Sequence, residues 1–321
     1  MKTTIDWLKF RSKMGPFELL ELVRPAFGTV GELLEIRTGA KPRDGWTHAA
    51  EIMLPDHLVA HIDYGGDSQR DWVRFDMPGS GCEWVQVWEH FASFDQIAEC
   101  EISRVDIALT ISDPSVVCDA KVVEAFEAGK FCCGGRPPSM KSVVDTDPTA
   151  GKTRYIGKRE NFKFLRCYEK GWELLKSLPP NAPFKLDTDI VIEVDHFGPV
   201  RAADLYRVEL ELKNVDKFIP WAVINRRDEV FASAYPFCAE LLPNLPHFHI
   251  QAIPSFKPRA ALAKALFNLS RSYGGTLKAA HLAYGGDDAA LLQIAKRVLA
   301  AEPSRHLVEK GVLTVDHEPF F

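Results

Sequence analysis

A run of basic residues around one tyrosine is the feature that most constrains this chain. The twenty residues from Gly151 to Lys170 (GKTRYIGKRENFKFLRCYEK) contain seven lysines and arginines and two glutamates, a local net charge of +5, whereas the whole chain carries −5. The seven cations are Lys152, Arg154, Lys158, Arg159, Lys163, Arg166 and Lys170. An acidic protein that concentrates cations in one segment is suited to bind an anionic backbone there.

The end of this run has the alternation that is typical of a strand. One face of the predicted strand carries Phe162, Phe164, Arg166, Tyr168 and Lys170. A phenol between an arginine and a lysine is suited to attack a phosphodiester, because the cations lower the cost of forming the phenolate and stabilise charge on the phosphoryl oxygens. Most single tyrosines on strands are packed or hydrogen-bonded instead. The interpretation therefore depends on partners elsewhere in the chain.

Two further predicted strands supply carboxylates. Over Leu205–Lys213, alternation places Arg207, Glu209, Glu211 and Lys213 on one face and three apolar residues on the other. Two glutamates so close on one strand face can share a divalent cation through oxygen ligands. Cross-strand ion pairs on an exposed strand are the common alternative. Over Glu101–Ser112, the polar face carries Asp106, and the small residues that follow leave room around its carboxylate.

Three charged segments follow one another in the chain: RVDIA at 104–108, YIGKRENFKFLRCYEK at 155–170 and RVELELK at 207–213. In this order they resemble the replication initiation factor family of Rep_trans type, whose members start rolling-circle replication of small plasmids and filamentous phages. Flanking segments also look like that family, particularly its phage members: IDWLKF (5–10), PGSGC (78–82) and SYGGTLKAAHLAYGGDD (272–288). One segment departs from the pattern, since many relatives have GSRxS where this chain has GKREN at 157–161.

The resemblance implies an enzyme that nicks and rejoins DNA at an origin. Tyr168 would form a 5′-phosphotyrosine link and release a 3′-hydroxyl that primes synthesis, with Arg166 and Lys170 beside it. Asp106, Glu209 and Glu211 would hold Mg²⁺ or Mn²⁺. The cations expected to contact DNA are Lys152, Arg154, Lys158, Arg159, Lys163, Arg207 and Lys213. Expected partners are phage or plasmid origin DNA, single-stranded or in a hairpin at the nick, a host helicase, and a second copy of the chain. Tyr155 is interpreted as a packing or stacking residue.

Two other functions remain open from the sequence. His247-Phe248-His249, on a predicted strand HFHIQAI, has the pattern of the metal site in HUH-type nucleases, with Tyr273 downstream as nucleophile. Alternatively, the chain binds DNA without cutting it, as a regulator whose carboxylates are structural.

The pattern of elements predicts an α+β fold with a central antiparallel sheet. Two related α/β halves, at about 1–135 and 150–255, would form a nicking-joining region (1–255), followed by a helical region (256–321). Helices are predicted at 17–23, 83–92, 116–129 and 169–178, and a hairpin joins 58–64 to 71–76. After Pro258, helical stripes contain Leu262, Leu266, Leu269 and Tyr273, then Leu291, Ile294, Ala295 and Val298.

Composition limits the location. No run approaches the about eighteen apolar residues that a membrane-spanning helix needs, and the first residues lack a signal-peptide core. Seven cysteines, an odd number without metal-type spacing, fit the reducing cytoplasm.

Overall fold

The computed structural model describes most of the chain in two units. It describes residues 2–146, 151–176, 190–194, 197–251 and 258–289, together with 292, 293, 296, 302, 303, 305 and 308. Contacts between residues divide the chain into 1–252 and 253–321. The two units are described separately, and the predicted boundary at 255 stays a prediction.

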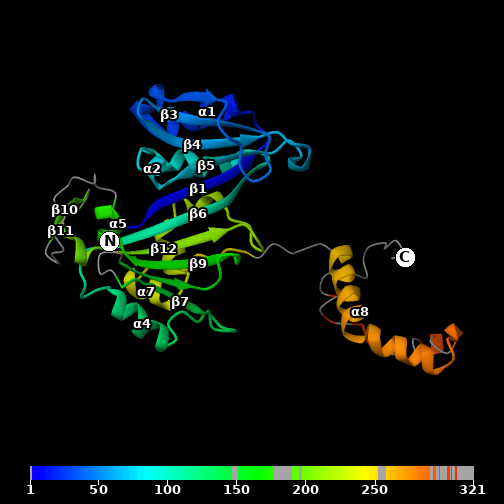
Figure 1. The fold of residues 1–321 in the computed structure, drawn as a ribbon. Helices are drawn as coiled ribbons and strands as arrows, with labels where there is room; N and C mark the ends of the chain where they lie inside the picture. Colours follow the sequence, from blue (N-terminus) through cyan, green and yellow to red (C-terminus); the bar gives the residue numbers. More distant parts are fainter. Residues whose placement is uncertain are drawn as a thin grey trace. The chain divides into compact units, whose positions relative to one another are not determined.

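A ten-stranded antiparallel sheet organises the first unit (Figure 1). Its strands are β1 (Thr4–Ser12), β2 (Glu35–Thr38), β3 (His48–Leu54), β4 (His57–Tyr64), β5 (Val73–Pro78), β6 (Cys100–Ile111), β7 (Met140–Val144), β8 (Lys152–Ile156), β9 (Lys163–Glu169) and β12 (Tyr206–Lys213). They lie in the order β2-β3-β4-β5-β1-β6-β12-β9-β8-β7. A separate hairpin consists of β10 (Val191–Val194) and β11 (Gly198–Arg201). The predicted α+β fold with a central antiparallel sheet is confirmed.

The sheet contains the same topology twice. From the centre outward, the first half runs β1-β5-β4-β3-β2 and the second runs β6-β12-β9-β8-β7. In each half, the first strand is central and the last strand lies beside it. The two central strands, β1 and β6, pair antiparallel, with Trp7 opposite Asp106. The two halves are therefore related in topology, although no sequence repeat is evident.

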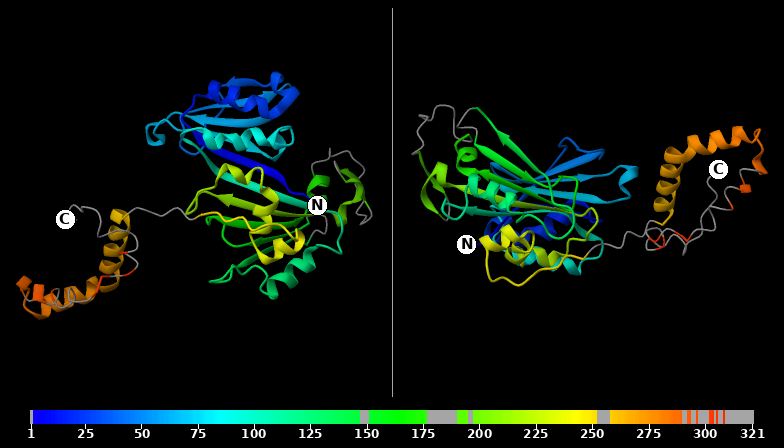
Figure 2. Two further views of the ribbon diagram at one scale, coloured as in Figure 1. Left: turned by 180° about the vertical axis from the view of Figure 1, so that it is seen from behind. Right: turned by 90° about the horizontal axis from the view of Figure 1, so that it is seen from below.

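One apolar core lies against the sheet. It combines the buried faces of the strands with side chains from α1 (Pro16–Val23), α3 (Trp88–Ala92), α4 (Asp119–Glu127), α6 (Arg227–Ala232) and α7 (Pro236–Leu241). Seen from behind in Figure 2, the yellow segment that contains α6 and α7 lies over the second half of the sheet. Shorter helices are α2 (Gly79–Cys82) and α5 (Lys170–Lys176), with 3₁₀ turns at Arg24–Leu33, Asp67–Gln69, Ser93–Gln96, Ala202–Asp204 and Trp221–Val223. Near the middle, Phe10 stacks on Phe75 at 4.6 Å between ring centroids and meets Trp221 edge-on.

Two predicted elements differ from the structure. Of the helix expected at 83–92, only Trp88–Ala92 (α3) is helical, because the amides of Gln86 and Val87 donate to the carbonyl of Ala26 instead of continuing a helix. The strand expected from His247 is wrong as far as residue 251: the segment is irregular, and the Phe248 amide donates to the Ser233 hydroxyl at 2.8 Å. The end of that predicted strand lies outside the described residues.

The second unit contains α8 (Pro258–Ala283), in agreement with the helix predicted after Pro258. In the described part of this helix, Leu266, Leu269 and Tyr273 are exposed. The second predicted stripe, 291–298, has its four apolar positions outside the described residues. A search of the described helices finds none that is long and apolar enough to cross a bilayer. All seven cysteines carry free thiols.

The aromatic cluster predicts where the fold is most sensitive to substitution. Phe10 is 0% exposed, so Phe10→Ala is expected to lower the free energy of unfolding by about 3–5 kcal/mol, as lost burial and a residual cavity add. Phe17 on α1 is 60% exposed, and Phe17→Ala should change it by less than about 0.5 kcal/mol. Urea unfolding measures both; equal effects would contradict this core.

Candidate active site

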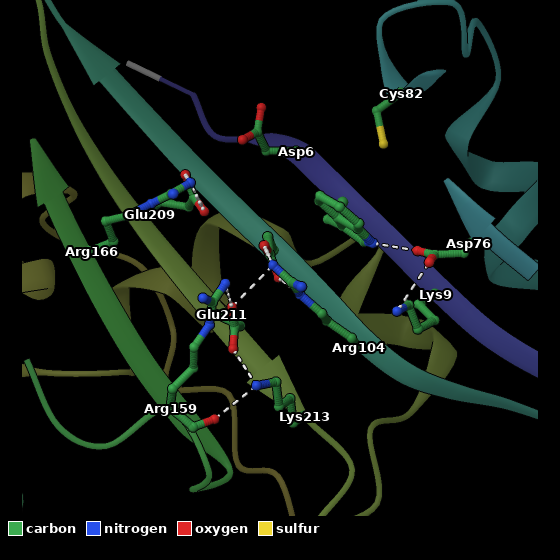
Figure 3. Close-up of polar contacts among 12 residues, drawn as sticks. Asp6, Lys9, Asp76, Cys82, Arg104, Arg159, Arg166, Glu209, Glu211 and Lys213 are labelled. Atoms are coloured by element: carbon green, nitrogen blue, oxygen red, sulfur yellow. Dashed lines mark hydrogen bonds and ion pairs between the residues drawn. The ribbon is translucent and has the colours of Figure 1, made fainter. Parts of the chain in front are cut away.

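The register of three neighbouring strands gathers the predicted catalytic residues on one sheet face. On β9 and β12, Tyr168 lies opposite Arg207 and Arg166 lies opposite Glu209. On β12 and β6, Glu211 lies opposite Asp106. Directly opposed residues of an antiparallel pair share a face, so residues far apart in sequence become neighbours, as Figure 3 shows for the charged groups around Glu209 and Glu211.

Tyr168 is buried but keeps a polar contact. Its side chain is 6% exposed, and its hydroxyl donates to Oε2 of Glu209 at 3.3 Å. The Arg166 guanidinium lies 4.9 Å and the Lys170 ammonium 5.8 Å from the ring centroid. Lys170 begins α5 and pairs with Glu173 at 3.1 Å.

Burial outweighs the effect of the cations on the Tyr168 pKa, so the expectation of a readily formed phenolate is wrong. Burial raises the pKa of this phenol well above its ordinary value, and the charge of Arg207 opposes that rise only in part. The negative charge of Glu209 acts in the same direction as burial. Tyr168 is therefore held as a neutral phenol that donates to a carboxylate, which is a natural acceptor for its proton.

Glu209 connects the phenol to the nearest arginine. One terminal nitrogen of Arg166 lies 2.6 Å from each Glu209 carboxylate oxygen. The carboxylate is 3% exposed, so its negative charge needs this partner.

Arg104 connects the other two carboxylates. Its Nε donates to Oδ1 of Asp106 at 2.8 Å, and its Nη2 lies 3.0 Å from Oε2 of Glu211. Lys213 also contacts Glu211, at 2.7 Å, as does Arg159 at 3.4 Å (Figure 3). Burial raises the pKa of Asp106 to about 7, against the opposing effect of Arg104. Burial acts on Glu211 in the same way, but Lys213 and the arginines outweigh it and lower the Glu211 pKa.

Arg207 is held beside Tyr168 by residues that the sequence did not assign. It donates to Thr110 Oγ1 and to Asp6 Oδ1, both at 2.9 Å. Asp6 lies within IDWLKF, the opening segment that resembles the family, and this was the only signal in the sequence for its proximity.

Three cations predicted to bind DNA lie on the opposite face of the sheet. In the register of β8 and β9, Arg154 lies opposite Cys167 and not opposite Tyr168. Its guanidinium binds both carboxylate oxygens of Asp119 on α4, each at 2.7 Å. Lys152 also lies toward Asp119, at 4.0 Å. Lys163 donates to the Ala234 carbonyl at 2.5 Å. The grouping of all seven cations around the tyrosine is therefore wrong, because strand alternation divides them between two faces.

The site fits a divalent cation only in part. Glu209 and Glu211 line a cavity of about 30 Å³ with Tyr155, Arg159, Phe164 and Arg166. Oε1 of Glu211 is buried, and the Lys213 ammonium lies 2.7 Å from it. These two carboxylates fit a hard cation. Asp106 does not join them as it stands, since Arg104 binds both its oxygens.

The predicted metal ligands, Asp106, Glu209 and Glu211 included, do not form a three-residue cluster in the described ranges. Within the ranges that the structure describes, no three histidine, cysteine, aspartate or glutamate side chains are placed to bind one ion. His247 and His249 are exposed on an irregular segment, and Tyr273 is exposed on α8.

Comparison with known proteins separates the two halves of the sheet. Residues 100–252, which begin at β6, match the family model of the replication initiation factor. Over this stretch the chain is similar to replication initiation factors. The resemblance seen in the sequence is thus confirmed for the half that contains Tyr168.

A solved protein structure has a similar fold. It is the rolling circle replication initiator protein from Geobacillus stearothermophilus, with a TM-score of 0.50 and 16% sequence identity, over 72% of this chain and 83% of that one. At this identity the likeness shows the fold alone. Among curated proteins, none matches the chain.

Burial of Tyr168 predicts its titration. Because its folded pKa lies above the ordinary value, the phenol should stay neutral between about pH 9 and 11, where a free tyrosine ionises. Phenolate absorbance of wild type and Tyr168→Phe should then rise equally over this range. One fewer ionising group in the variant would contradict a buried phenol. Below pH 10 the raised pKa leaves stability intact; above it, the unfolded state loses its proton first and stability falls.

Proposed function

We propose that this protein initiates rolling-circle replication by nicking and rejoining DNA at a phage or plasmid origin through Tyr168. The observation that carries the proposal is the hydrogen bond from the Tyr168 hydroxyl to Glu209, with Arg166 and Arg207 beside it, in a region that matches the replication initiation factor family. A nucleophile in contact with a base and flanked by cations is suited to phosphoryl transfer.

The residues support a transesterification. The Tyr168 oxygen forms a bond to the scissile phosphorus as the bond to the 3′-oxygen breaks, which leaves a 5′-phosphotyrosine and a free 3′-hydroxyl. The phenolic proton passes to Glu209, and the leaving 3′-oxygen takes a proton from solvent. Arg166 and Arg207 position the phosphate and stabilise its charge. The covalent link conserves the bond energy, so rejoining is the same step in reverse.

A divalent cation completes the proposal. Glu209 and Glu211 would hold Mg²⁺ or Mn²⁺, and Asp106 would join them on release from Arg104. When bound, the cation supplies polarisation of the phosphoryl oxygens. The DNA at the nick is single-stranded or in a hairpin, since the scissile phosphate has to leave the duplex to reach the buried Tyr168 hydroxyl. A host helicase, a second copy of the chain and the cytoplasmic location remain expectations, and the free thiols are in keeping with the last.

One observation favours a second function, a regulator that binds DNA without cutting it. Asp106, Glu209 and Glu211 each have a cationic partner in the structure, as structural carboxylates would. Cleavage decides between the two functions.

Nicking should depend on Tyr168. With origin DNA and Mg²⁺ or Mn²⁺, wild type is expected to form a covalent protein–DNA adduct, visible on a denaturing gel, and Tyr168→Phe to lose at least about a thousandfold in rate. Tyr64→Phe is the matched control and should keep activity, because Tyr64 lies on β4 of the first half and its ring packs against His48. Glu209→Gln should slow adduct formation by about a hundredfold or more, as the proton acceptor is lost.

Other outcomes of the nicking assay would support one of the alternative functions. An adduct that survives in Tyr168→Phe would redirect attention to His247, His249 and Tyr273. Absence of any adduct on DNA that the wild type binds would favour the regulator.

Metal binding should be measurable in the absence of catalysis. Mn²⁺ binding, followed by electron paramagnetic resonance, should weaken by at least about tenfold in Glu211→Gln, because a charged ligand is lost. Glu240→Gln, which changes an exposed carboxylate paired with Lys130, should bind as wild type does. Equal affinity of both variants would contradict the proposed site, and chelation by EDTA should abolish nicking.

A further inference from the structure

A large cavity lies on the sheet face opposite Tyr168. Its volume is about 810 Å³, within the size range of ligand pockets. It is lined by the segments around 131–139, 157–163, 216–217, 230–235 and 247–250. Leu210 and Leu212, on the apolar face of β12, form part of its wall, which places it behind the sheet as seen from Glu209 and Glu211.

The charges around this cavity are unbalanced. Arg136, Lys158, Lys163 and Lys217 line it, whereas Asp216 is the single lining carboxylate, giving +3 with the histidines neutral. In the part of the chain that the structure describes, Arg136, Lys158 and Lys217 have no ion-pair partner. The arginines that face Tyr168 are, by contrast, each bound to a carboxylate. Cations left unpaired around a hollow are suited to an anionic ligand.

Aromatic rings line the same cavity. Phe162 and Tyr235 are buried in its wall, and the half-buried Phe248 lies with His247 and His249 along one side. Lys217 lies 5.1 Å from the Phe162 centroid and Lys163 lies 3.9 Å from that of Tyr235. Aromatic rings interleaved with cations are the arrangement by which proteins bind unpaired nucleotides, through base stacking and phosphate contacts.

The turn between β8 and β9 connects this cavity with the tyrosine face. Lys158 of the turn lines the cavity, whereas its neighbour Arg159 pairs with Glu211 on the other side of the sheet. A flexible anionic strand that crosses this turn therefore meets cations on both sides.

The geometry points to a second binding site for single-stranded DNA in this cavity, with bases against Phe248 and phosphates against Lys158, Lys217 and Arg136. The identity of the ligand rests on the proposed function. Binding and cleavage would then take place on different faces of the sheet. Tyr168 contacts the scissile phosphate on one face, and the cavity on the other face holds the strand beside the nick. The HUH-type pattern His247-Phe248-His249 thus acquires a role in DNA binding that needs no metal.

The test measures binding of a fluorescein-labelled oligothymidylate of about ten nucleotides by anisotropy, in the full chain with Tyr168→Phe and EDTA so that no cleavage occurs. Phe248→Ala is expected to weaken binding by at least about fivefold. Lys158→Gln and Lys217→Gln should each lower the slope of log affinity against log salt by about 0.7. Phe17→Ala and Lys41→Gln, exposed positions of the first half, are the matched controls.

Three further measurements make the result decisive. A 5-bromouracil oligonucleotide should cross-link on irradiation to peptides that contain Tyr235 or Phe248, which does not depend on any variant folding. Unchanged affinity and slope in the cavity variants, with cross-links elsewhere, would overturn the inference. Binding of thymidine monophosphate in the cavity without binding of the oligonucleotide would overturn it too. Adduct formation is measured separately, in cavity variants that keep Tyr168. A failure of the proposed cavity site can thus be distinguished from a failure of the nicking proposal.

Discussion

Strand alternation across β6, β12 and β9 is the constraint on which the rest of the molecule depends. Successive side chains of a strand point to opposite faces, so burying Val208, Leu210 and Leu212 in the core directs Glu209 and Glu211 to the other face. A shift of one residue would bury both carboxylates among apolar groups, at a cost of several kcal/mol for each unpaired charge. Packing of the core thus sets the geometry of the candidate active site.

The site is a network of buried charges that a substrate has to enter. Asp106, Glu209 and Glu211 are 1%, 3% and 4% exposed, and leaving any one of them unpaired would cost about 3–5 kcal/mol. In the proposed reaction, the DNA phosphate would replace the carboxylates as partner of the arginines, and a divalent cation would replace the arginines as partner of the carboxylates. Each exchange alone would leave buried charges without partners. DNA and metal are therefore expected to bind cooperatively, each raising the affinity of the protein for the other.

The sequence predicted most of this arrangement, and its errors have a common cause. Alternation within each strand correctly placed Tyr168, Glu209 and Glu211, because that signal is local. Arg154 and Lys163 were assigned by their proximity to the tyrosine in the chain, but they lie on its opposite face. The contact of Arg207 with Asp6 spans 201 residues and leaves no local pattern. The raised pKa of Tyr168 reflects how deeply the assembled sheet buries it, which composition cannot reveal.

The two halves differ at the position that matters for chemistry. Aligning Arg74-Phe75-Asp76 on β5 with Arg207-Val208-Glu209 on β12 places Asp63, opposite Arg74, where the second half has Tyr168, opposite Arg207. Asp63 is 0% exposed and bound by Arg43 and Arg74, each within 2.8 Å. The first half thus retains the strand order and the ion pairs but has a carboxylate in place of the phenol. The proposed nucleophile therefore belongs to the second half, where residues 100–252 match the replication initiation factor family, and an ion-paired carboxylate fills the equivalent position of the first half.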